Sequence, residues 1–244
     1  MKTSPIITAS AIALALGSLA APQAFSQASA PTGALSASPT RVQTGTKPTL
    51  KWNITYPMFV SDYAAVNPVS TVTPNENMLA DIRVIGAGVT TITKYANGTT
   101  KTTYLETVGK VRYNGGGWTT IFDGKNTDSK VQTQAIVSTL SVNAGQPISF
   151  GGYYISSVGA QSPFYSSGSP NVRTLINGDT PPANLPVYYA PTLASFLKPY
   201  LDASGKISIG PMDVIVLMEL TSTDPAYVGY DLQDLVLLVT FRKP

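Results

Sequence analysis

The most hydrophobic part of the chain consists of two short apolar runs near its C-terminus, at residues 214–220 and 235–239. A polar segment rich in turn residues separates them. Runs of this length, bounded by turn signals and rich in Val, Leu and Ile, are typical of β-strands that are buried on both faces. The pattern therefore predicts a central β-hairpin at this end of the chain.

The register of this hairpin follows from the alternation of side chains between the two faces of a strand. We expect Asp213 to lie opposite Arg242, because a slip by one residue would bury Asp213 and Glu219 among aliphatic side chains. In that register one face carries eight large apolar side chains: Val214, Val216, Met218, Leu220, Leu235, Leu237, Val239 and Phe241. The opposite face is apolar in its middle, and a short helix over residues 193–201 is expected to cover it.

Alternating patterns and turn signals predict further strands along most of the chain. Two hairpins are expected, one around Asn97-Gly98 and one around the glycine-rich turn at 114–117. The predicted strands are residues 50–56, 79–85, 90–95, 99–108, 110–113, 118–122, 131–142 and 146–151, and residues 206–209 lead into the terminal hairpin. We therefore expect an all-β protein, an antiparallel β-sandwich of the immunoglobulin-like, Greek-key type that is enlarged by long loops and carries one short helix.

The first 28 residues have the pattern of a secretory signal peptide. Lys2 supplies the positive charge, residues 6–21 are apolar and rich in small side chains, and Ser26-Gln27-Ala28 forms a cleavage site. An uncleaved membrane anchor is the weaker interpretation, because the apolar core is short for a bilayer span. We expect a secreted or cell-surface protein, with the periplasm as an alternative, and no membrane insertion after removal of the leader.

Residues 38–56 form the next informative pattern. Ser38-Pro39-Thr40-Arg41-Val42 precedes Gly45, and Pro48-Thr49-Leu50-Lys51-Trp52 follows it. This arrangement resembles the opening of bacterial immunoglobulin-like domains, in which an edge strand turns at a glycine into a core strand. The resemblance implies a Greek-key sandwich in an extracellular, adhesive or multidomain protein. We expect a linker and first edge strand at residues 29–46, and a single β-sandwich domain at 47–244.

Composition narrows the chemistry that this chain can perform. The sequence contains no cysteine and no histidine, which excludes disulfides, thiolate nucleophiles, histidine-based catalytic triads and zinc sites built from these residues. The net charge is +3 without a visible basic cluster, so nucleic acid and acidic membrane surfaces are not expected partners. We expect a protein that is not an enzyme and that has no cofactor.

A tyrosine-rich stretch at residues 150–191 is the main candidate for binding. Its Tyr, Ser, Gly and Asn content is similar to that of antibody binding loops, where rigid rings provide contact area and small polar residues adapt. Such rings can stack on sugars or dock a partner chain, or they can simply cover the end of the sandwich. The candidate binding residues are Tyr153, Tyr154, Tyr165, Tyr188 and Tyr189.

Four carboxylates lie in or beside the loop of the C-terminal hairpin: Glu219, Asp224, Asp231 and Asp234. They can hold a hard cation such as Ca²⁺, or two of them can serve as acid and base in a glycosidase. However, the spacing of an EF-hand is missing, and Asp224-Pro225 is typical of a turn. We therefore interpret these residues as solvated loop charges, and predict no metal ligand and no catalytic residue.

Two further features have structural interpretations. Asp123, Asn126 and Asp128 form a second candidate loop of oxygen ligands, but turn formation explains the loop equally well. Trp118 follows three glycines and is expected to pack in the core against a cross-strand neighbour, Tyr113 or Val111. Neither feature changes the expected class of protein.

These patterns favour an exported structural, surface or adhesive protein, whose partners are other protein chains, including copies of itself, or surface glycans. A carbohydrate- or ligand-binding module that uses loop tyrosines is the alternative. A glycoside hydrolase or lyase based on carboxylates is a more distant one. Filaments of the purified protein would favour self-assembly, glycan binding by a monomer would favour the module, and turnover of a polysaccharide would favour the enzyme.

Overall fold

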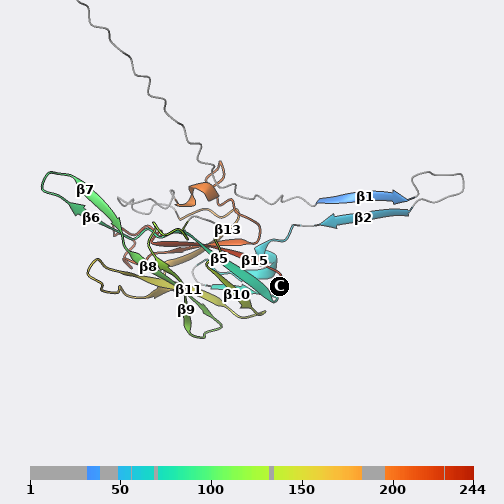
Figure 1. Ribbon diagram of the computed structural model, residues 1–244. Helices are drawn as coiled ribbons and strands as arrows, with labels where there is room; N and C mark the ends of the chain where they lie inside the picture. Colours follow the sequence, from blue (N-terminus) through green and yellow to red (C-terminus); the bar gives the residue numbers. More distant parts are fainter. Residues whose placement is uncertain are drawn as a thin grey trace, which may run out of the picture.

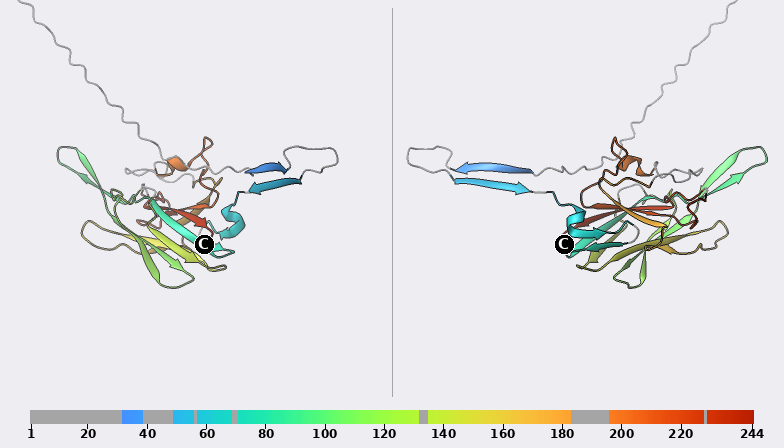
Figure 2. Two further views of the ribbon diagram at one scale, coloured as in Figure 1. Left: turned by 45° about the vertical axis from the view of Figure 1, so that its right-hand side comes forward. Right: turned by 180° about the vertical axis from the view of Figure 1, so that it is seen from behind.

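The computed structural model describes residues 32–38, 49–55, 57–68, 71–131, 135–182, 196–227 and 229–244. Within these residues the chain folds mainly into antiparallel β-sheets, which confirms the predicted fold class. A five-stranded and a six-stranded sheet pack against each other as in a sandwich (Figure 1). Two separate two-stranded hairpins extend away from this body (Figure 2).

The two main sheets combine strands that are distant in the sequence. The five-stranded sheet has the order β10 (Ser138–Val142), β5 (Met78–Gly86), β15 (Leu235–Arg242), β14 (Asp213–Met218) and β13 (Val172–Ile176). The six-stranded sheet has the order β3 (Ala64–Val66), β4 (Thr71–Pro74), β11 (Ile148–Ile155), β8 (Glu106–Tyr113) and β9 (Trp118–Gly124), with β12 (Tyr165–Ser166) paired to β11. The last strand of the sequence, β15, is thus the middle strand of its sheet.

The hairpin β14–β15 has the faces that the sequence predicts. The eight apolar side chains of one face all belong to a single buried cluster, which also contains Phe150 of the opposite sheet. The register differs from the prediction by two residues, because Asp213 lies opposite Thr240. Arg242 instead forms an ion pair with Asp81 of β5, at 2.7 Å. A shift by two residues leaves every side chain on its own face, so hydrophobic burial permits both registers and neighbouring contacts decide between them.

The opposite face of the hairpin is covered by the helical segment that precedes it. Phe196 and Leu197 share a second buried cluster with Ile215, and the 3-10 helix η1 (Lys198–Tyr200) continues the cover. The predicted helical cover is confirmed here, although residues 193–195 lie outside the described part of the chain. Both faces of β14 and β15 are therefore buried.

The N-terminal hairpin differs from the expectation. In the described structure, β1 (Thr32–Ser38) and β2 (Thr49–Thr55) pair with each other in a separate two-stranded sheet, which we call the arm. Leu35 and Trp52 lie opposite each other on the arm, with 55% and 67% of their surface exposed. The strand expected to enter the core therefore extends away from it in both views of Figure 2, because alternation predicts a strand but not the sheet that the strand joins.

Several other segments refine the predicted strands. The hairpin of β6 (Thr90–Lys94) and β7 (Thr100–Tyr104) forms around Asn97-Gly98, as expected. Of residues 131 and 135–142, which the structure describes, only Ser138–Val142 form a strand, β10. The tyrosine-rich stretch is more regular than its composition indicates, because it contains part of β11 and all of β12 and β13.

Helical structure is scarce among the residues that the structure describes. Besides η1, a short helix α1 (Val60–Tyr63), which the sequence did not predict, leads into β3. In the described ranges, no helix has the length and apolar character needed to cross a bilayer. The predicted signal peptide, residues 1–28, lies outside these ranges, so it stays a prediction.

Candidate functional site: an acidic pocket beside the central hairpin

Three carboxylates meet where the loop between β14 and β15 returns to the sheet. Glu219 directly follows β14, Asp234 directly precedes β15, and Asp231 lies earlier in the same loop. Because the two strands pair with each other, the two ends of the loop are held together. One oxygen atom of each carboxylate lies within 4.8 Å of the other two. We call these three residues the acidic cluster.

The acidic cluster is buried, with exposed fractions of 0%, 5% and 5% in sequence order. The interpretation of these three residues as solvated loop charges is therefore wrong. Tyr230 and Leu232, which alternate with the acidic residues in the loop, pack into the second buried cluster and draw the loop against the sandwich. Asp224 is exposed as expected, and its carboxylate accepts a hydrogen bond from the Ala226 N–H in a turn.

Glu219 is held by four hydrogen bonds that are all donated to it. Its Oε1 atom accepts from the N–H of Thr221, at 3.1 Å, and from the Thr221 hydroxyl. Its Oε2 atom accepts from the N–H groups of Asp231, at 2.9 Å, and Leu232, at 3.2 Å. Leu232 adopts a left-handed backbone with φ of 57°, which is uncommon for a large side chain. These bonds fix the position of both carboxyl oxygens of Glu219.

Asp231 and Asp234 lie next to the carboxylate of Glu219, and neither of them forms an ion pair in the described structure. Asp231 accepts hydrogen bonds from the backbone and the side-chain amide of Gln233, and Asp234 accepts one from the Leu220 N–H at 2.7 Å. Burial raises the pKa of Asp231 to about 7. Burial, together with the charge of Glu219, raises the pKa of Asp234 well above its usual range. Neither ion pair of the described residues involves the acidic cluster.

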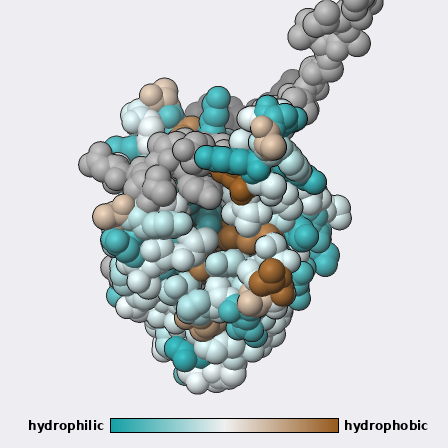
Figure 3. Space-filling model, turned by 90° about the vertical axis from the view of Figure 1, so that its left-hand side faces the viewer, coloured by the Kyte–Doolittle hydropathy of each residue, from teal (hydrophilic) through white to brown (hydrophobic). Residues whose placement is uncertain are grey.

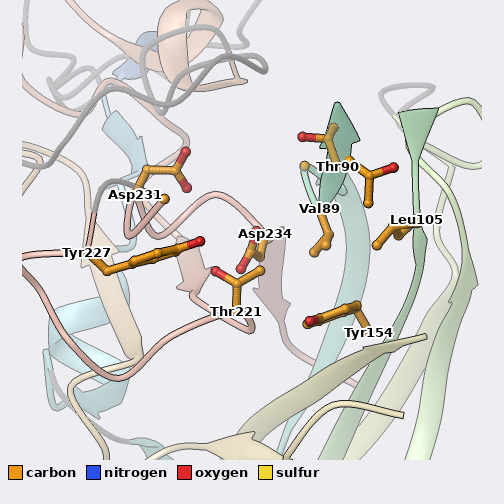
Figure 4. Close-up of a pocket in the computed structure, with 11 residues that line it drawn as sticks. Val89, Thr90, Leu105, Tyr154, Thr221, Tyr227, Asp231 and Asp234 are labelled. Carbon is orange, nitrogen blue, oxygen red and sulfur yellow. The ribbon is translucent and has the colours of Figure 1, made fainter. Parts of the chain in front are cut away.

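A small pocket opens onto Asp231 and Asp234. It encloses about 170 Å³ and lies between this loop, the base of the β6–β7 hairpin and β11. In Figure 4, Tyr227 and Tyr154 enter the pocket from opposite sides, and their hydroxyl groups point toward its middle, near Asp234 and Thr221. Figure 3 views the side of the molecule from which β6 and β7 extend, where small apolar areas lie between separate hydrophilic ones on a mostly weakly polar surface.

The structure brings two of the five predicted tyrosines to this site. Tyr154 lines the pocket. Burial raises the pKa of the Tyr165 hydroxyl, and nearby Tyr154, Glu219 and Asp234 raise it further. Tyr153 belongs to the other face of β11, because neighbours in a strand point to opposite sides, and the Lys110 ammonium lies 5.5 Å from its ring centre.

Tyr188 and Tyr189 lie outside the described residues, so their place is not defined. The pocket instead contains Tyr227, a residue that the sequence did not single out. Gly229 permits its position, since a Cβ atom there would lie 2.8 Å from the Tyr227 ring. The sequence signal that could have identified Tyr227 is a tyrosine among turn residues in the loop that precedes the last strand of the hairpin.

The other candidate residues have structural roles. Asn126 accepts a hydrogen bond from the Ala87 N–H, and Asp128 accepts one from the Lys130 N–H, which fits a turn. Trp118 is only partly buried. Its ring packs edge-to-face on the ring of Phe164, with 4.8 Å between the ring centres, and the Arg112 guanidinium lies over it. The predicted partners Tyr113 and Val111 are not opposite Trp118, because its neighbour across the strands in β8 is Arg112.

Comparisons with known proteins found no matching family model, no matching curated protein and no matching solved structure. The function must therefore be inferred from the chemistry of the site. The pocket offers buried carboxyl groups that bind hydroxyls or cations, and tyrosine rings that provide flat contact area. This combination suits recognition of a small polar ligand.

Proposed function

We propose that this chain is an exported, non-enzymatic β-sandwich protein that acts outside the cytoplasm as an adhesive or surface protein, and that its pocket binds a terminal sugar residue of a glycan. The observation that carries the proposal is that the hydroxyl groups of Tyr154 and Tyr227 point toward the middle of one pocket, near Asp234, and that Asp231 also lines this pocket.

The size and chemistry of the pocket support a monosaccharide unit as the ligand. Its volume of about 170 Å³ is below the roughly 300–1,000 Å³ that is typical of sites for drug-sized molecules. Sugar hydroxyls form hydrogen bonds with carboxyl groups, and the apolar face of a sugar ring packs on a tyrosine ring. Tyr154, Tyr227, Asp231 and Asp234 supply both kinds of contact.

Binding is favoured over glycoside hydrolysis by the position of the carboxyl groups. Hydrolysis uses two carboxyl groups that flank the scissile bond, one as an acid and one as an ionised carboxylate. Asp231 and Asp234 belong to the same loop and offer oxygen atoms within 4.8 Å of each other, so they face a ligand from one side. Glu219, the third carboxylate, does not line the pocket.

Glycan-array binding by the chain without its leader, residues 29–244, tests this proposal. Wild-type protein is expected to bind a subset of glycans, and Tyr227→Ala is expected to lower that binding at least tenfold by removing stacking area. Tyr95→Ala is the matched control, because Tyr95 is as exposed as Tyr227, at 48% against 47%, but lies outside the pocket. Equal binding by the two variants, or no glycan binding by the wild type, would refute the proposal.

A second function, self-association, is favoured by the exposed arm. Leu35, Trp52 and Ile54 share one face of the arm, because Leu35 pairs with Trp52 and Ile54 lies two residues further along β2. All three side chains are exposed, and an isolated two-stranded hairpin is only marginally stable in water. The opposite face carries Ser36 opposite Lys51, so two copies of the chain can bring their apolar faces together without opposing charges.

We expect the arms of two copies to pair in this way. Analytical sedimentation of residues 29–244 measures the resulting balance between monomer and dimer. A change of Trp52→Ser should shift the protein toward monomer, whereas Lys51→Ser, the neighbouring change on the polar face, should leave the assembly unchanged. A wild-type protein that stays monomeric at every concentration would contradict self-association while leaving the glycan proposal intact.

A further inference from the structure

We propose that the acidic cluster of Glu219, Asp231 and Asp234, together with the side-chain oxygen of Gln233, binds one hard divalent cation, and that Ca²⁺ is the best match. This site shares Asp231 and Asp234 with the pocket but also includes Glu219, which does not line it. It does not depend on the glycan proposal, because a cation can bind these oxygens whether or not a sugar occupies the pocket.

The charges of the cluster call for a positive partner. Three carboxylate oxygens within 4.8 Å of one another repel strongly when they are ionised in a buried environment. No Lys or Arg of the described residues donates a hydrogen bond to Glu219, Asp231 or Asp234 or forms an ion pair with them. Either protons or a cation must therefore neutralise the site.

An unpartnered oxygen beside the cluster indicates a cation. Gln233 is only 1% exposed, and its amide nitrogen donates to Asp231, so the end of its side chain lies at the cluster. Its Oε1 atom is buried and has no hydrogen-bond partner among the described residues. Protons on the carboxyl groups would neutralise the cluster, but they would leave Gln233 Oε1 without a partner unless one of them pointed at this oxygen. A bound Ca²⁺ would satisfy it directly, because amide oxygens are common ligands of Ca²⁺.

A second oxygen in the pocket has the same character. The hydroxyl Oγ1 of Thr90, a residue that lines the pocket with Asp231 and Asp234, is buried and lacks a hydrogen-bond partner in the described structure. Thr90 lies on the pocket wall formed by the β6–β7 hairpin, so a polar group in the pocket can pair with this oxygen.

The ligand set of the cluster favours Ca²⁺ over Mg²⁺. Ca²⁺ takes six to eight oxygen ligands at about 2.3–2.6 Å in a flexible arrangement, and oxygens within 4.8 Å of one another fit inside this sphere. Mg²⁺ demands a near-ideal octahedron and is usually held by one or two carboxylates and several waters, whereas this cluster offers three carboxylates and an amide oxygen. The pocket supplies an entry path and room for the waters that complete six to eight ligands.

Calorimetric titration of CaCl₂ into chelator-treated protein, residues 29–244 at pH 8 and without glycan, tests this inference. We expect one Ca²⁺ per chain, a rise in the melting temperature on binding, and affinity for Mg²⁺ at least tenfold weaker. Asp234→Asn should weaken Ca²⁺ binding by about 10- to 100-fold or more, since changes in outer-shell residues alone have effects of that size.

Two controls keep the result interpretable. Asp224→Asn removes an exposed carboxylate from the same loop and should leave Ca²⁺ affinity unchanged. Asp234→Asn relieves charge repulsion, so in chelator at pH 8 it should melt no lower than the wild type, which shows that lost binding is not lost folding. The inference is overturned if the wild type shows neither heat nor a melting shift up to about 10 mM CaCl₂, above the range of weak extracellular sites, or if Asp234→Asn binds Ca²⁺ normally.

Discussion

Two hairpins of this protein carry apolar side chains in different patterns and lie in opposite environments. The arm, β1–β2, exposes Leu35 and Trp52 to solvent. The hairpin β14–β15 is enclosed by β5 and β13 at its edges and by a buried cluster on each face. In the arm, apolar side chains alternate with polar ones, whereas β14 and β15 are apolar at nearly every position.

The difference shows what a hydrophobic pattern does and does not define. A continuous apolar run needs cover on both faces, so it predicts a central strand. Alternation needs cover on one face, and that cover can come from the same domain or from another molecule. The stability of the fold should therefore depend on β14–β15, and association with a partner should depend on the arm.

The largest effect is expected from a cavity in the central hairpin. Leu237→Ala removes a fully buried side chain from the cluster between the two sheets and should lower the free energy of unfolding by about 2–5 kcal/mol. Leu35→Ala, the same change on the arm, should alter it by no more than about 0.5 kcal/mol. Urea denaturation followed by tryptophan fluorescence and circular dichroism measures both. Similar losses for the two variants would mean that the arm belongs to the cooperative core.

A change of pH should act on the central hairpin and leave the arm unaffected, because the arm has no carboxylate. The folded-state pKa of Asp231, about 7, exceeds the ordinary value of 3.8, so protonation stabilises the fold most at low pH, and this contribution is lost as pH rises through 7. In chelator, stability should fall by on the order of 1–3 kcal/mol between pH 5 and 8.

The variant Asp231→Asn isolates this effect, since burial also raises the pKa of Asp213 at the other end of the hairpin. Melting curves across the pH range should be flatter for the variant than for the wild type. An identical slope would assign the pH dependence to Asp213 or Asp234 and remove Asp231 from the explanation.

The smallest global effect is expected at a glycine of the arm. A Cβ atom at Gly33 would lie 2.4 Å from the backbone oxygen of Asn53, so Gly33→Ala should separate β1 from β2 locally. Hydrogen exchange of the arm amides should accelerate while global unfolding changes by less than about 0.5 kcal/mol. Gly109→Ala, where a Cβ would lie 2.7 Å from Cδ2 of buried Leu235, should instead cost about 1–3 kcal/mol. A global loss from Gly33→Ala would contradict the separation of the two hairpins.

Much of the fold was predictable because it depends on local pattern. The apolar runs identified the central hairpin and both of its faces, and Asn97-Gly98 identified a turn. The exact register was not predictable, because it is selected by β5 and by the ion pair of Asp81 with Arg242, a contact between residues far apart in the sequence. The sheet that each strand joins has the same long-range origin.

The candidate site was less predictable. Glu219, Asp231 and Asp234 were recognised as a group, but burial of charge is unfavourable in general, so a solvated loop was the natural expectation. Their burial follows from Tyr230 and Leu232, which pack under the loop. Tyr154 was identified by composition, but its meeting with Tyr227 depends on the packing of β11 beside that loop.

The place of β15 has a consequence for the order in which this protein can fold. β15 comes after all the other described strands in the sequence, yet it lies between β5 and β14. While synthesis proceeds from the N-terminus, β5 and β10 remain without their central partner, so the sandwich cannot close until the final strand is available.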